Sequence, residues 1–384
     1  MYSSDRVTSL QESSNFTIRV AQIALPSGIS GPHAITCEEG LIASITPISS
    51  NYDDVLLSPG FIDLQVNGIG EIDVSCAHDN DWQILDQGLL QQGVTTWFPT
   101  LMSAPLTRYP EYFRQITLAQ LRTNVHRPTI AGIHLEGPYL GDAIGAHDPR
   151  LVLHDNPYWF SAIPDNVRIV TIAPENAATL TAIKILRERN VVVSIGHTLA
   201  SDERTLAAID AGAQLVTHLF NAMSGIHHRH DGVALVALTD DRVAVSLIAD
   251  LVHVQPRAIN LAFRAKPEGV VLITDSVAYL SPNNKRRGMI LRDGAPRFFD
   301  DVHTHDTLAG SSLAMNEAIK NVTEMCSIDL HSAIQAATAT PARLLGLSDR
   351  GAIAVGRRAD LVALDQAYAV RHTWLGGQLV LSRH

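Results

Sequence analysis

Short apolar runs alternate with longer amphipathic stretches through most of this chain. The runs have the length and the largely apolar composition of buried strands. They cover residues 61–66, 94–98, 130–135, 167–172, 191–195, 214–218, 243–249 and 270–274. Helical patterns such as 177–189 and 202–211 separate them. Strands that alternate with helices eight times predict an α/β fold, a (β/α)8 TIM barrel.

The two ends of the chain have a different pattern, with short strand-like runs. Near the N-terminus these are residues 16–21 and 41–45, on either side of a turn at Gly40. Their counterparts near the C-terminus are residues 351–353, 359–364, 370–374 and 378–381. Because isolated strands need partners, we expect the two ends to pair. The predicted domains are a small β-sandwich from residues 1–58 and 347–384, and a barrel from residues 59–346.

Two helical patterns and a polar stretch lie between the eighth run and the C-terminal strands. The helices are expected over 312–326, with Ser311 or Ser312 as N-cap, and over 330–345, with a break near Pro341. The polar stretch covers residues 281–306. Its charges and glycines favour an insertion over the barrel mouth that acts as a lid.

Four of the apolar runs end in an acidic or imidazole side chain: Glu136, His197, His218 and Asp275. Parallel barrel strands all point their carboxyl ends to one face, so side chains far apart in sequence meet there. A single run ending in histidine is more often a core or surface histidine. Four at comparable positions favour a divalent metal site.

Composition excludes several classes of function. The net charge of −10 over 384 residues argues against a nucleic-acid surface, which needs a basic face. Residues 1–20 are polar and mixed, without the charged and apolar regions of a signal peptide or a membrane anchor. Cys37, Cys76 and Cys326 form no CxxC pair, which suits reduced thiols. We therefore expect a cytoplasmic protein with no membrane or nucleic-acid partner.

Three motifs together resemble those of the N-acetylglucosamine-6-phosphate deacetylases, a family of the amidohydrolase superfamily. They are Pro-Gly-Phe-Ile-Asp-Leu-Gln-Val-Asn-Gly at 59–68, His-Leu-Glu-Gly-Pro-Tyr-Leu at 134–140 and Thr-His-Leu-Phe-Asn-Ala-Met at 217–223. The segment 351–364 is shared widely among amidohydrolases, whereas the second and third motifs are specific in combination. The resemblance extends over essentially the whole chain.

The resemblance implies that Glu136, His197 and His218 hold one divalent cation, with zinc expected and iron(II) as the alternative. Many amidohydrolases bind a second metal through His-x-His on the first strand. Gln65 and Asn67 occupy those positions here, and neutral amides are poor ligands. We therefore predict a single-metal site.

The resemblance also implies roles in catalysis and in substrate binding. Asp275 is expected to take and return the proton, and His147 to hydrogen-bond the developing oxyanion. Taken alone, Asp275 would be interpreted as a cap of the turn that starts at Ser276, but its position at the end of the eighth strand, beside three expected ligands, favours the catalytic role. The expected substrate-binding residues are Gln65, Ala146, His147, Asn221, Ala222, Arg229, His253, Leu308, Ala309 and Gly310.

Other histidines are interpreted as decoys. His303 and His305 have His-x-His spacing but lie in a polar loop, which does not hold two imidazoles rigidly. His227, His228 and His230 read as an exposed turn around Arg229, the residue that aligns with the family's phosphate-binding arginine. The family also suggests a homodimer in which this arginine is lent across the interface.

The expected reaction is hydrolysis of N-acetylglucosamine 6-phosphate to glucosamine 6-phosphate and acetate. One alternative is the galactosamine epimer, because the orientation of a single hydroxyl depends on loop contacts. The other is an inactive protein that binds phosphorylated amino sugars, suggested by the unusual loop 226–231. Retention of Asp275 argues against this last alternative, since a sensor needs no proton carrier.

Overall fold

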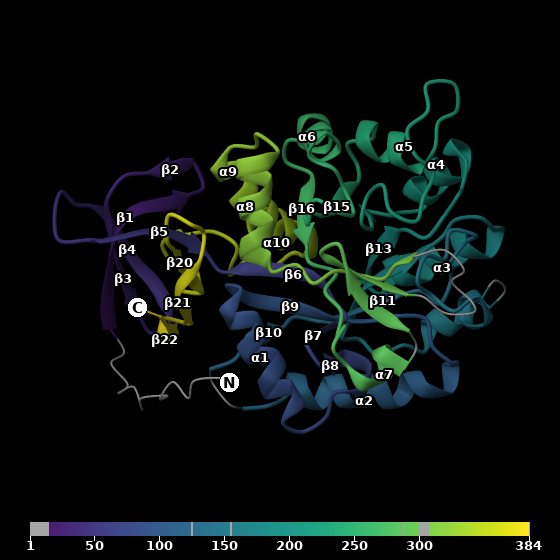
Figure 1. Ribbon diagram of the computed structural model, residues 1–384, viewed down its shortest axis with the longest axis horizontal. Helices are drawn as coiled ribbons and strands as arrows, with labels where there is room; N and C mark the ends of the chain where they lie inside the picture. Colours follow the sequence, from purple (N-terminus) through teal and green to yellow (C-terminus); the bar gives the residue numbers. More distant parts are fainter. Residues whose placement is uncertain (1–14, 124–125, 154–155, 287, 299–306, 384) are drawn as a thin grey trace.

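Eight parallel strands form a barrel in the computed structural model, which describes residues 15–123, 126–153, 156–286, 288–298 and 307–383 (Figure 1). In order around the barrel they are β6 (Phe61–Val66), β9 (Val94–Leu101), β11 (Ile133–Glu136), β12 (Val167–Ile172), β13 (Val192–Ile195), β14 (Leu215–Val216), β15 (Ala244–Ile248) and β16 (Val270–Ile273). The last strand meets the first where the Asp275 backbone N–H donates to the Gln65 carbonyl at 2.9 Å. The predicted TIM barrel is confirmed.

Several of the expected strands differ in extent, among them the third and the sixth. The run 130–135 divides into β10 (Thr129–Ile130), which pairs with Trp97 and its neighbour on β9, and β11, which pairs further along β9 and with β12. The run 214–218 forms a strand of two residues, because the chain turns sharply at His218, whose φ is 32°. Because β14 ends at Val216, His218 lies beyond the strand, at the barrel mouth.

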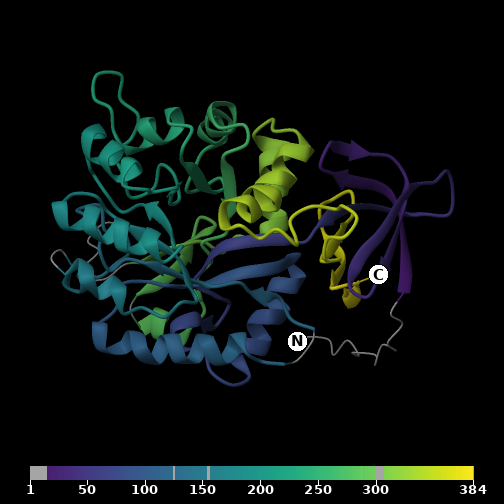
Figure 2. The ribbon, with the colours of Figure 1, turned by 180° about the vertical axis from the view of Figure 1, so that it is seen from behind.

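Helices follow most of the barrel strands and pack around them (Figure 2). Their bounds are α1 (Asp81–Gln91), α2 (Tyr109–Gln120), α3 (Ala177–Glu188), α4 (Asp202–Asp210), α5 (Val233–Thr239), α6 (Pro256–Ala265), α8 (Met315–Met325), α9 (Leu330–Ala337) and α10 (Ala339–Leu345). Asn176 and Ser201 cap α3 and α4 through their side-chain oxygens, which accept backbone N–H groups. After β11 the connection carries two 3₁₀ turns, Pro149–Leu151 and Pro157–Ser161, in the described part.

Of the two C-terminal helical patterns, the first needed correction. The first helix begins at Met315 behind Ala314, not behind Ser311 or Ser312. Ser311 is used elsewhere, since its hydroxyl donates to the Thr274 carbonyl. The second pattern breaks at Thr338, close to Pro341 as expected. Proline obstructs the carbonyl four residues before it, so Pro341 ends the preceding helix at Ala337 and lies in the first turn of α10.

One mixed sheet combines strands from both ends of the chain. Its order is β22 (Gln378–Ser382), β21 (Val370–Leu375), β20 (Leu361–Leu364), β5 (Asp53–Pro59), β1 (Asn15–Leu25), β3 (His33–Glu38) and β4 (Leu41–Pro47), with β2 (Gly28–Ser30) beside β1. Ile35 on β3 and Trp374 on β21 belong to one buried cluster, so the two ends of the sheet share a core. Figure 1 shows this unit beside the barrel, the N-terminal strands in purple and the C-terminal ones in yellow.

The polar insertion contains α7 (Pro282–Arg286), β17 (Met289–Arg292) and β18 (Ala295–Phe298), and β18 pairs with β19 (Thr307–Leu308). Met289 and Phe298 are buried against Ala146, Val277 and Ala309. The insertion thus packs beside the barrel mouth, while its movement as a lid remains a prediction. The candidate decoys at 303 and 305 lie outside the described residues. In the described part of the chain, no helix is both long and apolar enough to cross a membrane.

Candidate active site

The side chains of Glu136, His197 and His218 meet at the carboxyl ends of β11, β13 and β14. Glu136 Oε1 lies 3.2 Å from Nε2 of each histidine, and the two Nε2 atoms are 3.0 Å apart. All three residues are at least 95% buried. Burial acts to raise the pKa of Glu136, but the close approach of His147, His197 and His218 outweighs burial and holds the pKa well below its usual range. The carboxyl group is therefore ionised.

Three site residues have left-handed backbone conformations. The φ angles of His197, His218 and Asp275 are 52°, 32° and 49°, and each residue lies two positions beyond the end of a barrel strand. Non-glycine residues adopt this region at a cost, so such strain persists where surrounding structure imposes it, often at functional sites. The sharp turns aim these side chains across the barrel mouth.

Two amides from the end of β6 hold the Asp275 carboxylate. Asn67 Nδ2 and Gln65 Nε2 both donate to Asp275 Oδ1, at 2.7 and 3.0 Å, and Gln65 Nε2 also donates to Glu136 Oε1 at 2.8 Å. Burial raises the pKa of Asp275 well above its usual range, and the charge of Glu136 adds to the effect. Gln65, predicted to bind substrate, thus lies between two carboxylates, whereas Asn67 lines the cavity.

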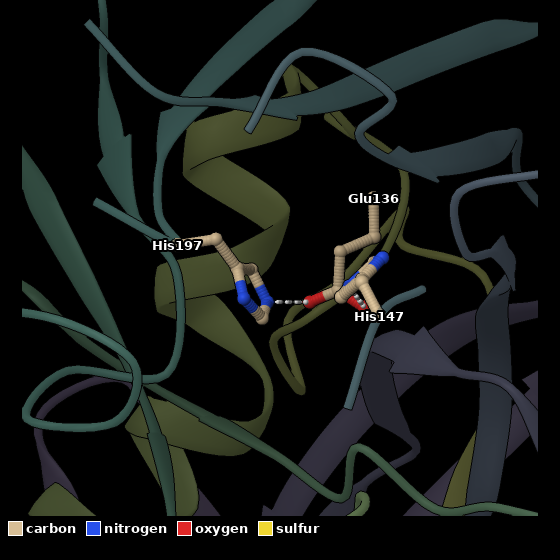
Figure 3. A group of neighbouring side chains, drawn as sticks. All are labelled: Glu136, His147 and His197. Carbon is tan, nitrogen blue, oxygen red and sulfur yellow. Dashed lines mark hydrogen bonds and ion pairs between the residues drawn. The ribbon is translucent and has the colours of Figure 1, made fainter. Parts of the chain in front are cut away.

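His147 lies beside Glu136 and His197 (Figure 3), and the ring centroids of the two histidines are 4.5 Å apart. Its Nε2 lies 3.6 Å from Glu136 Oε2, too far for a hydrogen bond. Its Nδ1 accepts the backbone N–H of Ser103 at 3.3 Å. A backbone N–H only donates, so the neutral imidazole carries its hydrogen on Nε2. Glu136, His147 and His197 also have donor atoms within 4.8 Å of one another, which makes them a second possible ligand set.

A cavity of about 230 Å³ opens at this cluster. Residues at its wall include the expected His147, Ala146, Asn221, Ala222, His253, Leu308 and Gly310. His253 is oriented by Asp250, whose carboxylate lies 2.7 Å from His253 Nδ1 and also accepts the backbone N–H of His253. The other ring nitrogen of His253, Nε2, is therefore available to a molecule bound in the cavity.

Some expected binding residues have different surroundings from those predicted. The backbone N–H of Asn221 donates to the His218 carbonyl at 2.9 Å, so this turn already uses it. Ala309 packs in a small apolar cluster instead of lining the cavity. Gly310 has φ of 62°, and a Cβ there would lie 2.3 Å from Val277, so glycine is required.

Arg229 lies outside the cavity in this chain. It is exposed in the loop after β14, where His227 and His230 form a bridge beside it, as expected for an exposed turn. The loop projects above α4 and α5 in Figure 1. A single copy of the chain therefore does not bring Arg229 to the other site residues.

Sequence reasoning missed the partners that orient the site. No sequence pattern indicates that Ser103 contacts His147, that Asp250 contacts His253, or that side-chain amides hydrogen-bond Asp275.

A larger cavity of about 650 Å³ lies at the opposite end of the barrel, near Gln214 and Gly269, where β14 and β16 begin. It contains none of the site residues named above.

Comparison with known proteins identifies the family. Residues 56–380 match the model of the Amidohydrolase family. The chain is 35% identical over 346 residues to N-acetylglucosamine-6-phosphate deacetylase of Bos taurus, covering 85% of this chain and 83% of the relative. It is 32% identical over 382 residues to N-acetylgalactosamine-6-phosphate deacetylase of Escherichia coli O157:H7, covering 94% and 98%.

Solved structures agree with this. A mutant of N-acetyl-D-glucosamine-6-phosphate deacetylase from Mycobacterium smegmatis, in complex with N-acetyl-D-glucosamine-6-phosphate, has a TM-score of 0.87 and 31% identity, covering 96% of this chain and 100% of that one. The Thermotoga maritima N-acetylglucosamine-6-phosphate deacetylase has a TM-score of 0.86 and 29% identity, with the same coverage. The chain belongs to the Amidohydrolase family and, within it, to the N-acetylglucosamine-6-phosphate deacetylases, hydrolases that act on an amide bond.

Proposed function

We propose that this protein uses one divalent cation to hydrolyse N-acetylglucosamine 6-phosphate to glucosamine 6-phosphate and acetate. The observation that supports it most is the triangle of Glu136, His197 and His218 donor atoms beside the amide-held carboxylate of Asp275. The substrate named for most of the relatives supports the choice of sugar.

The triangle fits a tetrahedral cation. Ligand atoms about 2.0–2.1 Å from zinc are separated by about 3.3 Å, close to the observed 3.0–3.2 Å. Nδ1 of His197 faces the Ala143 carbonyl and carries its hydrogen there, so Nε2 has a free lone pair. His147, with its hydrogen on Nε2, is the poorer ligand. We assign zinc, and a bound cation would polarise the acetyl carbonyl and lower the pKa of water.

Asp275 is the proton carrier in this proposal. Its Oδ1 already accepts two amide N–H groups, so Oδ2 is the atom that takes the proton from the attacking water. The raised pKa lets the carboxyl group hold that proton. Oδ2 then returns it to the leaving nitrogen as the C–N bond breaks.

His147 serves as the hydrogen-bond donor to the carbonyl oxygen. Ser103 fixes its tautomer through the backbone N–H, which leaves the Nε2 hydrogen facing the cavity. As negative charge develops on the oxygen of the acetyl group, this donor stabilises the tetrahedral species.

His253, Ala222, Leu308 and Gly310 surround the remaining part of the cavity and would contact the sugar and its phosphate. The exposed position of Arg229 suits an arginine that completes the site of a second subunit. We propose a homodimer on this basis. The free thiols Cys37, Cys76 and Cys326 suit the cytoplasm as its location.

Replacing Arg229 by alanine is expected to raise KM about tenfold with little change in kcat, because the phosphate does not react. Initial rates over a range of substrate concentrations measure this. Arg204→Ala, on the exposed start of α4, is the control. Mixing the Arg229→Ala protein with an Asp275→Asn protein should restore low-KM activity if the arginine acts across the interface. No restoration on mixing would place its action within its own subunit.

The galactosamine epimer is the second candidate substrate, because the relative named for it covers 98% of its own length in the match. Acetate release from both sugar phosphates, with metal-free enzyme and after addition of zinc, decides between them. We expect zinc-dependent release with the gluco sugar preferred. A higher kcat/KM for the galacto sugar would reverse the assignment. Tight binding without acetate release would indicate a sensor instead.

A further inference from the structure

A second cavity of about 230 Å³ adjoins the active-site cavity. The two have Asn67, Met102, Ala146 and Val277 in common as wall residues. Beyond this shared wall, apolar side chains that include Ala104, Pro105, Leu151, Met289 and Phe298 line the second cavity. Polar side chains, among them Asp73, Ser75, Thr100, Ser103 and Asn284, line the rest of it. We call it the side chamber.

The side chamber lies at the acyl end of the expected substrate position. The phosphate and the N-acyl group of an amino-sugar 6-phosphate are at opposite ends of the sugar ring. Ala222 and His253 follow β14 and β15, whereas Asn67 and Met102 follow β6 and β9, across the barrel. Ser103, next to Met102, holds His147, the residue assigned to the acyl carbonyl. The acyl chain therefore points toward the shared wall.

We propose that the enzyme also hydrolyses N-acyl groups longer than acetyl, and that Met102 sets the length accepted. The inference rests on the proposed function. The reaction is unchanged in kind: water adds to the acyl carbon, the C–N bond breaks, and a longer carboxylate and the free amine leave. Methionine is flexible, so its displacement opens the shared wall to a chain of two further methylenes.

The test compares kcat/KM for the N-butanoyl and N-acetyl forms of glucosamine 6-phosphate, by following amine release. Because both are measured on one preparation, their ratio does not depend on the fraction of folded enzyme. Met102→Ala should raise the butanoyl-to-acetyl ratio about tenfold, as burial of two methylenes allows. Ala104→Leu, which narrows the chamber, should lower the ratio. Met315→Ala, in the core of α8, is the matched control and should leave it unchanged.

An unchanged ratio in both chamber variants, with normal acetyl hydrolysis, would overturn this proposal alone. Absence of hydrolysis of either substrate by the wild-type enzyme would instead overturn the proposed function.

A separate observation concerns the layer of the barrel beneath the metal-binding triangle. His134 Nδ1 donates to the Leu64 carbonyl at 2.9 Å, and its Nε2 lies 2.8 Å from Thr171 Oγ1. Thr171 Oγ1 lies 2.8 Å from Thr217 Oγ1, which also bonds the Ser194 hydroxyl. We call His134, Thr171, Thr217 and Ser194 the polar belt. Their side chains are fully buried where barrel interiors are usually branched and apolar.

The polar belt joins the strands that carry the triangle. His134 precedes Glu136 by two residues on β11, Thr217 directly precedes His218, and Ser194 is on β13, which leads into the turn with His197. The bond from His134 to Leu64 reaches β6, which is not a neighbour of β11. Buried hydrogen bonds of this kind are strongly directional, so they fix the spacing of the strands they connect.

We infer that the polar belt positions the three metal ligands relative to one another, so that its central hydroxyls determine metal affinity. Positioning partners outside the ligand set commonly contribute 10- to 100-fold in affinity, as a rough range. Thr171→Val keeps the shape of the side chain and removes the central hydroxyl, which breaks two bonds of the belt.

The experiment measures zinc affinity of the metal-free full-length protein by competition with a chromophoric chelator, together with Tm. Thr171→Val should weaken zinc binding about 10- to 100-fold. Ser194→Ala, at the end of the belt, should weaken it less. Thr373→Val is the matched control, since Thr373 is equally buried and its hydroxyl bonds the Leu90 carbonyl far from the site. It should lower Tm with zinc affinity kept. Wild-type affinity in Thr171→Val, or an equal loss in the control, would refute the inference.

Discussion

Replacing Asp275 by asparagine is expected to lower kcat by about 10²- to 10⁴-fold while the protein keeps its metal. Asparagine has the same shape but cannot accept and return a proton. Steady-state acetate release measures kcat, and elemental analysis measures the bound metal. The metal ligands we propose are other residues, so metal content should stay at one ion per chain.

Asp86→Asn is the control for this experiment. Asp86 is also a buried aspartate, but it pairs with Arg122 at 2.8 Å, away from the cavity. Its replacement should lower Tm and leave kcat near the wild-type value. Near wild-type turnover in Asp275→Asn would show that another group carries the proton. Loss of both metal and turnover would show that Asp275 helps to hold the cation.

Removing the metal with a chelator is expected to lower activity at least about a thousandfold, because polarisation of an amide carbonyl supplies several kcal/mol of transition-state stabilisation. One equivalent of zinc per chain should restore the rate. The metal-free protein should also have a lower Tm, since a ligand that binds the folded state stabilises it. Full activity after verified metal removal would contradict the proposal, and a requirement for two equivalents would contradict the single-metal site.

Variants of two histidines distinguish the possible ligand sets in the same assay. His218→Ala should lose the metal and therefore activity. His147→Ala should keep the metal and lose activity through kcat, since its Nε2 is proposed as a donor to substrate. If His218→Ala kept the metal and His147→Ala lost it, His147 would be the metal ligand and His218 the donor to substrate.

The sequence by itself determined the barrel and the side chains that meet at its mouth. Runs such as 61–66 and 167–172 have the length of a strand and are largely apolar, and such segments have few alternatives to a parallel sheet covered by helices. Glu136, His197, His218 and Asp275 were identifiable because each directly ends such a run. Because the strands pair in parallel, residues at the carboxyl ends of different runs come close together in space.

Only the tertiary structure decided which groups orient those side chains. The hydrogen bonds of Ser103 to His147 and of Asn67 to Asp275 join residues 44 and 208 positions apart. Such pairs depend on loop paths and side-chain rotamers, and periodicity contains no information about either. The same holds for Gln65, which the structure places between two carboxylates. Local pattern specifies which face is buried, whereas partners across the barrel are selected by packing and by the need to satisfy every buried polar group.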